Sequence, residues 1–361
     1  MSRILENQLR NEIPEIIRSW FDGEKGKVSF EKRTAKGGHT ADVIHDIAGY
    51  RFIIECKNAA SSGLVADAIK NLQKLLAEMP EAAKETTTVP LVAVPFMGEA
   101  GRELCRREKI SWLDLSGNAS VTAPRLKIQI EGKPNRFKSA GRPKNLFAPK
   151  SSRIARTLLI NPEIALTQRE LARKTRLNET LVGRVVRELE RENFLQRDES
   201  GAVRAREPGL LLDAWAESYQ FERHALVYGF MAQRTGEAVM RAAAESLEKN
   251  RIEYAATGLA GAWLLSHFAA FRVASFYLKE MPSLALLEKL KITEQSKAGG
   301  NLWLIVPNDD GVFEGASERD GSIRCAHPVQ VYLDLKFHPE RAREAQEAVR
   351  GEYLAWENDR K

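Results

Sequence analysis

The stretch "ADVIHDIAGYRFIIECK", residues 41–57, decides how the first part of this chain folds. Two runs rich in β-branched and aromatic residues flank "AGY" at 48–50, which is the pattern of a hairpin with a short turn. Side chains alternate between the two faces of a strand, so Glu55 and Lys57 share one face. With the turn at 48–50, Asp42 is predicted to lie opposite the far end of the second strand, close to Glu55 and Lys57.

Two carboxylates and an ammonium group in one place suggest a metal-dependent site. Hard divalent cations such as Mg²⁺ prefer oxygen ligands, and a nearby lysine can orient or deprotonate a water molecule. We therefore predict Asp42 and Glu55 as metal ligands and Asp42, Glu55 and Lys57 as catalytic residues. The alternative is that Glu-x-Lys is only the solvated end of a strand.

The sequence around this hairpin alternates helix-like and strand-like runs, which indicates an α/β layer structure. The strand-like runs are "VSFEKR", "ADVIHDI", "RFIIECK", "VPLVAVPF", "ISWLDLSG" and "LKIQIEG", and the helix-like runs are "GLVADAIKNLQKLLAEM" and "GEAGRELCRREK". Asp114 and Asn118 are interpreted as the end of an edge strand and its turn.

The order of Asp42, Glu55 and Lys57, with a helix, a strand and a helix following, resembles the PD-(D/E)xK nuclease superfamily over roughly residues 1–130. Ala41 stands where the superfamily usually has Pro. The resemblance implies a restriction-endonuclease-like α/β domain that uses Mg²⁺. It also implies an acidic residue in the helix before the hairpin, for which Glu15 is the candidate.

The charge of the chain is concentrated in one segment. The formal net charge is +6, and eight basic residues without an acidic one lie between Gly132 and Pro162. Without those eight, 47 Lys and Arg would face 49 Asp and Glu. A concentrated basic segment is an electrostatic footprint for phosphate, and a solvated linker is the alternative. Lys144 and Lys150, in a part rich in Pro and Gly, are predicted to contact DNA phosphates.

The next segment has the pattern of a DNA-reading module. Thr167 and Glu170 form a capping box, and Asn178 is placed to cap the following helix, "ETLVGRVVRELEREN". On that helix an apolar stripe is predicted to be buried, with Gly183 and the arginines on the opposite side. A basic hairpin, "FLQRDESGAVRARE", follows, as in a winged helix-turn-helix. The predicted DNA-binding residues are Gln168, Asn178, Thr180, Arg184, Arg187, Arg197 and Arg204, together with Lys144 and Lys150.

The last segment carries a second resemblance. Five stretches, "LFAPKSSRIARTLL", the winged-helix pattern, "YAATGLAGAW", "NLWLIVPNDDGVF" and "HPVQVYLDLK", make residues 146–350 similar to AbiEi-type antitoxins, regulators of type IV toxin–antitoxin systems. The resemblance implies a winged helix that represses its own operon and a C-terminal domain that counters a toxin. This chain differs by carrying about 145 further residues in front.

The composition and the cysteine pattern predict where the protein is located. No basic-then-apolar leader opens the sequence, and the three cysteines are far apart and odd in number, so a reduced, cytoplasmic protein without a disulfide framework is predicted. Polar residues interrupt the apolar stretch 254–278, which favours a buried helix over 255–268 and a strand after it over a membrane span.

The predicted fold class is α/β + α, with a restriction-endonuclease-like α/β domain first, a central winged helix-turn-helix and a C-terminal mixed α/β domain. The predicted boundaries are 1–132 for the nuclease-like domain, 133–150 for a basic linker, 151–207 for the winged helix and 208–361 for the AbiEi-like domain. The predicted function is that of a homodimeric regulator and antitoxin that binds double-stranded DNA and a cognate toxin. A Mg²⁺-dependent DNA endonuclease and a protein-interaction scaffold stay open as alternatives.

Overall fold

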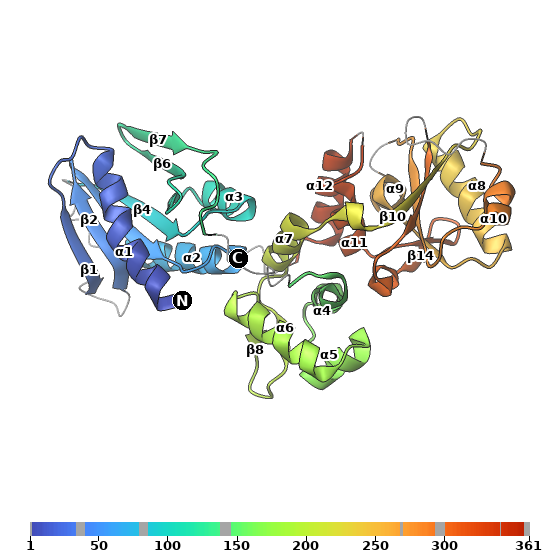
Figure 1. The fold of residues 1–361 in the computed structure, drawn as a ribbon, viewed down its shortest axis with the longest axis horizontal. Helices are drawn as coiled ribbons and strands as arrows, with labels where there is room; N and C mark the ends of the chain where they lie inside the picture. Colours follow the sequence, from blue (N-terminus) through green and yellow to red (C-terminus); the bar gives the residue numbers. More distant parts are fainter. Residues whose placement is uncertain are drawn as a thin grey trace. The chain divides into compact units, whose positions relative to one another are not determined.

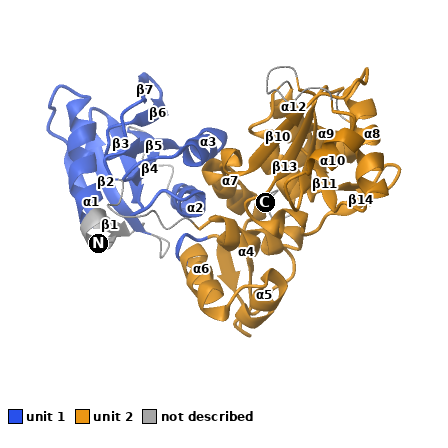
Figure 2. Cartoon of the chain, turned by 45° about the vertical axis from the view of Figure 1, so that its right-hand side comes forward, with its two compact units in different colours: residues 1–144, 191–193 blue, residues 145–190, 194–361 orange. Residues whose placement is uncertain are grey.

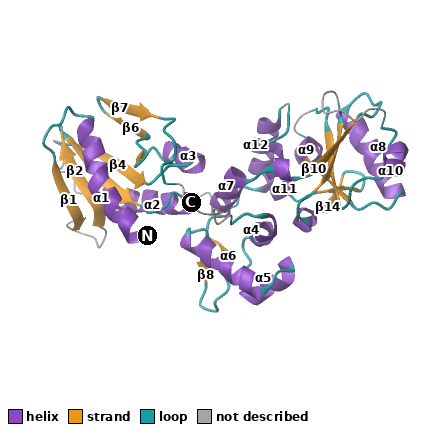
Figure 3. Ribbon diagram, viewed as in Figure 1, coloured by secondary structure: helices purple, strands orange, loops and turns teal. Residues whose placement is uncertain are grey.

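The computed structural model is a mixed α/β protein with twelve α-helices and three sheets in its described part (Figures 1 and 3). The described residues are 2–33, 40–78, 86–137, 146–267, 270–292, 300–339 and 341–356. The chain forms two compact units, residues 1–144 with 191–193 and residues 145–190 with 194–361 (Figure 2). The mixed α/β class predicted from the sequence is confirmed.

The first unit is a seven-stranded sheet whose strand order follows the chain. The strands β3, β4 and β5 run parallel to one another, and all other neighbours are antiparallel. Its elements are α1 (Ser2–Ser19), β1 (Lys27–Arg33), β2 (Thr40–Ile47), β3 (Tyr50–Cys56), α2 (Ser62–Glu78), β4 (Thr87–Val94), α3 (Glu99–Arg107), β5 (Ser111–Asp114), β6 (Ala119–Ala123) and β7 (Leu126–Ile130).

The predicted hairpin is confirmed as β2 and β3. Ala48 and Gly49 form its two-residue turn with φ of 49° and 80°, the left-handed backbone that a type I′ turn requires at both central positions. Gly49 adopts this conformation without steric cost, whereas Ala48 does so at some cost. The turn fixes the register, so that Ile47 faces Tyr50 and Val43 faces Ile54.

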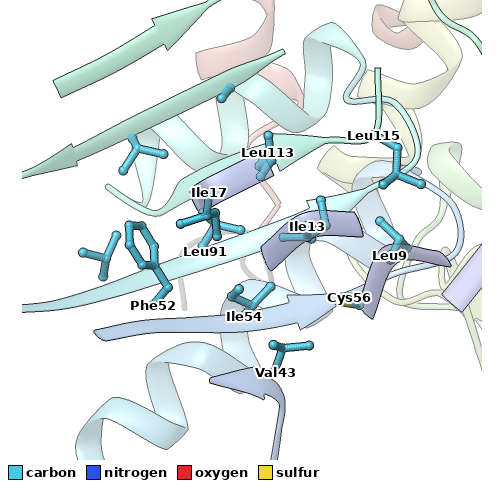
Figure 4. Close-up of a cluster of buried hydrophobic side chains, with 14 of the residues drawn as sticks. Leu9, Ile13, Ile17, Val43, Phe52, Ile54, Cys56, Leu91, Leu113 and Leu115 are labelled. Atoms are coloured by element: carbon cyan, nitrogen blue, oxygen red, sulfur yellow. The ribbon is translucent and has the colours of Figure 1, made fainter. Parts of the chain in front are cut away.

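The core of the first unit lies between α1 and one face of the sheet (Figure 4). Leu9, Ile13 and Ile17 recur every four residues, so they form one stripe on α1. All three are fully buried. They pack on alternate residues of the central strands, which include Phe52, Ile54, Leu91, Leu113 and Leu115. Because side chains alternate between the two faces of a strand, Glu55 and its neighbours lie on the other face of the sheet.

The strand β5 is not an edge strand, contrary to the sequence-based interpretation, because β6 pairs with it. The predicted turn after it is present. Asp114 is fully buried and accepts from the backbone N–H groups of Met97 (3.1 Å) and Asn118 (2.9 Å). Asn118 in turn bonds both backbone groups of Lys133. The two polar residues therefore tie a corner of the sheet together.

The second unit contains a helical part with a small hairpin, followed by a six-stranded sheet of order β10-β13-β12-β11-β15-β14. The first part consists of α4 (Pro149–Ile160), α5 (Gln168–Thr175), α6 (Glu179–Arg191), β8 (Leu195–Arg197) and β9 (Val203–Ala205). The rest consists of α7 (Pro208–Ser218), β10 (Ala225–Gly229), α8 (Gly236–Lys249), β11 (Tyr254–Thr257), α9 (Gly258–Ser266), β12 (Ala274–Leu278), α10 (Leu284–Lys289), β13 (Leu302–Val306), β14 (Ser317–Arg319), β15 (Ile323–Cys325), α11 (Pro328–Leu335) and α12 (Ala342–Tyr353).

The apolar stretch expected to be one helix over 255–268 is a strand and a helix, β11 and α9. Gly258 makes the change of direction with φ of +56°, and a Cβ there would lie 2.1 Å from Nε2 of His338. Only glycine fits, which is why the strand can turn straight into the helix. The closing helix α11 is buried along its whole length, so it belongs to the core of its own unit.

We predict that Ile13→Ala destabilises the first unit by about 2–5 kcal/mol, because it removes a fully buried side chain between α1 and the sheet. Pulse proteolysis in urea measures the change. The amount of a protected fragment of residues 1–130 reports how much of the first unit is still folded. Ile164→Ala, at a side chain that is 53% exposed, is the control and should leave that transition in place.

Candidate functional site

The three residues predicted as catalytic lie at the ends of β2 and β3. The register of the hairpin ends with Val43 opposite Ile54, so Asp42 and Glu55 are the next residues on β2 and β3, and the charge of Asp42 acts on Glu55. Asp42 Oδ2 also accepts from the backbone N–H of Cys56 at 2.8 Å. Glu55 is only 4% exposed. The two carboxylates are therefore neighbours at this end of the hairpin.

Lys57 completes this group. Its Nζ lies 3.8 Å from Oε2 of Glu55 and 3.6 Å from Oδ2 of Asp67, a residue of α2. Its side chain is 20% exposed, so the ammonium remains in reach of solvent. We name Asp42, Glu55 and Lys57 the hairpin-end cluster.

Sequence reasoning missed three neighbours of the cluster. Arg10 of α1 donates from Nη2 to Oδ1 of Asp42 at 3.1 Å, and Asp67 and Asn71 reach Lys57 and Glu55 from α2. Asp67 and Asn71 are four residues apart and therefore share one helix face, a spacing that could have pointed to them. Glu15 instead forms an ion pair with Arg18.

The electrostatics of Glu55 follow from its burial. Desolvation by burial, and after it the negative charge of Asp42, raise the pKa of Glu55 to about 7 against the opposing charge of Lys57. A carboxyl group with such a pKa is half protonated near neutral pH. A bound cation would favour its ionised form.

The carboxylates of the hairpin-end cluster have the chemistry that a hard cation prefers, but they are few. Asp42 and Glu55 supply carboxylate oxygens at the end of the hairpin, which Mg²⁺ accepts together with water. Across the described ranges, no group of three or more His, Cys, Asp or Glu side chains is placed to hold a metal.

The helical part of the second unit has the predicted caps. Thr167 and Glu170 form the capping box of α5, and Asn178 accepts from the backbone N–H of Leu181 at 2.7 Å at the start of α6. The Asn178 side chain thus has a structural role. Both caps place α6 at the position that the sequence predicts.

The face of α6 differs from the prediction at one residue. Thr180, Arg184 and Arg187 are exposed, as expected. Gly183 is buried, and the position of its missing Cβ is 3.0 Å from Oε1 of Gln168. The expectation that Gly183 faces outward is wrong, because this glycine allows α5 to pack closely on α6.

The arginines of the small hairpin β8–β9 have partners within the same part of the chain. Arg197 binds Glu190 through Nε and Nη2 at 2.8 and 2.9 Å and donates to the carbonyl of Gly201. Arg204 lies 4.0 Å from Glu163. These pairs are solvent-accessible, and exposed pairs of this kind contribute little to stability, so they can exchange partners.

The basic stretch does not act as one surface. Lys150 is exposed, and Lys144 lies outside the described residues. Arg153 binds Asp309 through Nε and Nη2 at 2.7 and 2.9 Å, and Arg156 is only 3% exposed. The fold of their own unit therefore engages these two arginines of α4, so they do not belong to an exposed basic surface.

Comparison with known proteins finds a family match within the second unit. Residues 202–355 match a family model described as "Transcriptional regulator, AbiEi antitoxin, Type IV TA system". The search of curated proteins gave no match. A solved structure, a repair endonuclease from Pyrococcus abyssi, aligns at 21% identity over 32% of this chain with a TM-score of 0.24. The chain spans 47% of the length of that structure.

Two further expectations concern the chain as a whole. Of the helices in the described ranges, none combines the length and the apolar character that crossing a membrane demands. Cys56, Cys105 and Cys325 are free and buried, as expected for a chain without a disulfide framework.

The raised pKa of Glu55 predicts a pH-dependent stability. The folded state binds this proton more tightly than the unfolded state, so stability is highest below about pH 4.5 and falls as the pH rises towards about 7. Glu55→Gln should remove this fall and stabilise the first unit above pH 7 by on the order of 1–3 kcal/mol.

Pulse proteolysis of the first unit between pH 4 and 8 measures the effect. Asp46→Asn is the matched control, because Asp46 lies on the partner strand β2 of the same hairpin and is paired with Arg51. An unchanged pH slope in Glu55→Gln would contradict the assignment.

Proposed function

We propose that this chain is a DNA-binding transcriptional regulator and antitoxin of AbiEi type, with a nuclease-like domain ahead of it. One observation carries the proposal. The segment that matches the AbiEi family model, residues 202–355, begins within β8–β9, directly after two capped helices. A DNA-reading module in front of a toxin-opposing domain is what such a regulator needs.

The proposed DNA-reading module is a winged helix-turn-helix made of α4, α5, α6 and the β8–β9 hairpin. The apolar stripe of α6 is buried and Arg184 and Arg187 are exposed, so α6 can enter a major groove with arginines towards the bases. The hairpin offers Arg197 and Arg204 to the phosphates, where they position the module without reading sequence.

One such module reads few base pairs, so regulators of this kind commonly bind as symmetric pairs. We therefore propose a cytoplasmic homodimer that binds an inverted repeat in its own promoter. The AbiEi-like segment would oppose a cognate toxin. Since α11 is buried within its unit, the surface for dimer or toxin contacts must come from other elements.

The two classes of basic residue should behave differently on DNA. Arg184→Ala or Arg187→Ala should weaken discrimination between the best site and a variant site by ~1–3 kcal/mol, which is the value of a bidentate arginine–guanine contact. Lys150→Ala should weaken binding to all sequences alike and reduce the salt slope by about 0.9.

Fluorescence anisotropy on duplexes over a range of salt concentrations measures both effects. Arg343→Ala, whose side chain is 91% exposed on α12, is the matched control for loss of a surface arginine. Identical behaviour of the α6 and Lys150 variants would contradict this division of roles.

The regulatory role is tested by footprinting the region upstream of the gene and by co-expressing the neighbouring gene. We expect a protected inverted repeat and rescue of growth when the neighbour is toxic. Absence of both, together with DNA cutting that needs Mg²⁺, would favour the endonuclease.

The second candidate is that endonuclease, and the hairpin-end cluster favours it. Asp42 and Glu55 would hold Mg²⁺, and a bound Mg²⁺ supplies activation of a water for phosphodiester hydrolysis. Lys57, 3.8 Å from Glu55, would orient that water or stabilise the developing charge. Arg10 now binds Asp42 and would have to share it with the cation.

We expect Mg²⁺ binding, measured calorimetrically at pH 8, to be lost in Asp42→Asn and in Glu55→Gln. Lys57→Ala should keep the metal and lose any DNA cutting. Asp46→Asn, the paired carboxylate on the same strand, should bind as the unaltered protein does. Equal Mg²⁺ binding in all of these variants would rule out the cluster as a metal site.

A further inference from the structure

A small cavity in the second unit contains a buried arginine without a hydrogen-bonded acid. The cavity has a volume of about 30 Å³, and one water molecule needs roughly 10–15 Å³. It therefore has room for about two oxygen atoms. Its walls include Arg156, Trp215, Tyr219, Arg223, His224 and Gln330, and we call it the Arg156 pocket.

Arg156 is a buried cation, and two of its donor atoms lack hydrogen-bond partners. It is 3% exposed, and its Nε and Nη1 atoms have no hydrogen-bond partner within the described chain. Its guanidinium lies over the ring of Trp215, 4.9 Å from the centroid, and that ring stacks on Phe147. Burial lowers the pKa of Arg156, although an arginine stays charged at neutral pH. The charges of Glu314 and Asp334 oppose this shift, but neither acid hydrogen-bonds Arg156 within the described residues, and a buried charge without such a partner is destabilising.

The nearby acids are bound elsewhere. Asp309 binds Arg153, and Glu314 accepts from the hydroxyl of Thr157 at 3.0 Å. Asp334 is fully buried and accepts hydrogen bonds from four side-chain donors, on Tyr219, Tyr277, Thr257 and Gln330. None of these carboxylates hydrogen-bonds Arg156 within the described residues.

The same network makes the pocket rigid. Gln330 donates to the hydroxyls of Tyr219 and Tyr277 at 2.9 Å. His224 Nε2 lies 2.9 Å from the hydroxyl of Tyr219 and its Nδ1 accepts from the backbone N–H of Asn308. Burial lowers the pKa of His224 to about 4, so this histidine is neutral at pH 7. Walls fixed in advance reduce the cost of ordering a ligand.

From this geometry we propose that the Arg156 pocket binds the carboxylate group of a small organic acid. The planar fork of a guanidinium matches a carboxylate, and the two oxygens of that group match the size of the cavity. Arg223 also lines the pocket and adds a second positive charge, while Asp309, which lines it as well, is paired with Arg153. The proposal goes beyond the regulator function and does not depend on it.

Calorimetric titration of the full chain with acetate, against chloride at equal ionic strength, is the test. We expect acetate to bind and to raise the thermal midpoint. Arg156→Met should weaken acetate binding roughly 10–100-fold, since charged hydrogen bonds are lost. The same variant without acetate should be as stable as the parent or more so, because an unpaired buried charge is gone.

Arg241→Met is the matched control, because Arg241 also lies over a tryptophan, Trp263, but is exposed and paired with Glu237. It should bind acetate as the parent does, and so should Arg184→Ala, which separates this site from any anion binding on the DNA-reading helix. Inorganic phosphate, with four oxygens, should bind more weakly than acetate.

Three results would overturn the proposal. One is acetate binding that persists in Arg156→Met. Another is no binding beyond that of chloride, which would mean that water alone fills the cavity. The third is phosphate binding as tight as acetate binding and equally lost in Arg156→Met, which would remove the carboxylate class.

Discussion

The register of the β2–β3 hairpin is the constraint on which the first unit depends. The two-residue turn at Ala48 and Gly49 sets this register. A shift by one residue would turn every side chain to the opposite sheet face. In the observed register one face meets the apolar stripe of α1, and Asp42 and Glu55 are neighbours at the end of the hairpin. The same turn therefore determines both the packing of the core and the hairpin-end cluster.

In the second unit, the helix α4 makes the contacts that connect its parts. Its arginines look in sequence like part of a DNA-binding surface, yet Arg153 binds Asp309 and Arg156 enters a cavity. These contacts join the first helix of the proposed winged helix to the AbiEi-like segment. A ligand at Arg156 would therefore lie where α4 meets the segment that matches the AbiEi family model.

Caps and apolar stripes were predictable because they are local. The Thr167–Glu170 box and the Asn178 cap need only residues within three positions, and the alternation in β2 needs only one strand. Gly183 was misread because its environment comes from Gln168 on a neighbouring helix. The edge assignment of β5 failed because β6 consists of small and polar residues with no strong strand pattern.

The sequence by itself determined the hairpin and the helix order around residues 167–191, and it predicted that Asp42, Glu55 and Lys57 lie near one another at the hairpin end. These follow from periodicity and from turn and cap chemistry, which act over a few residues. Only the tertiary structure decided that Arg10 and Asp67 join the hairpin-end cluster, that Glu55 is buried enough to raise its pKa, and that Arg156 lacks an acid. Burial and ion pairing depend on residues distant in the chain, and no local pattern encodes which of them meet.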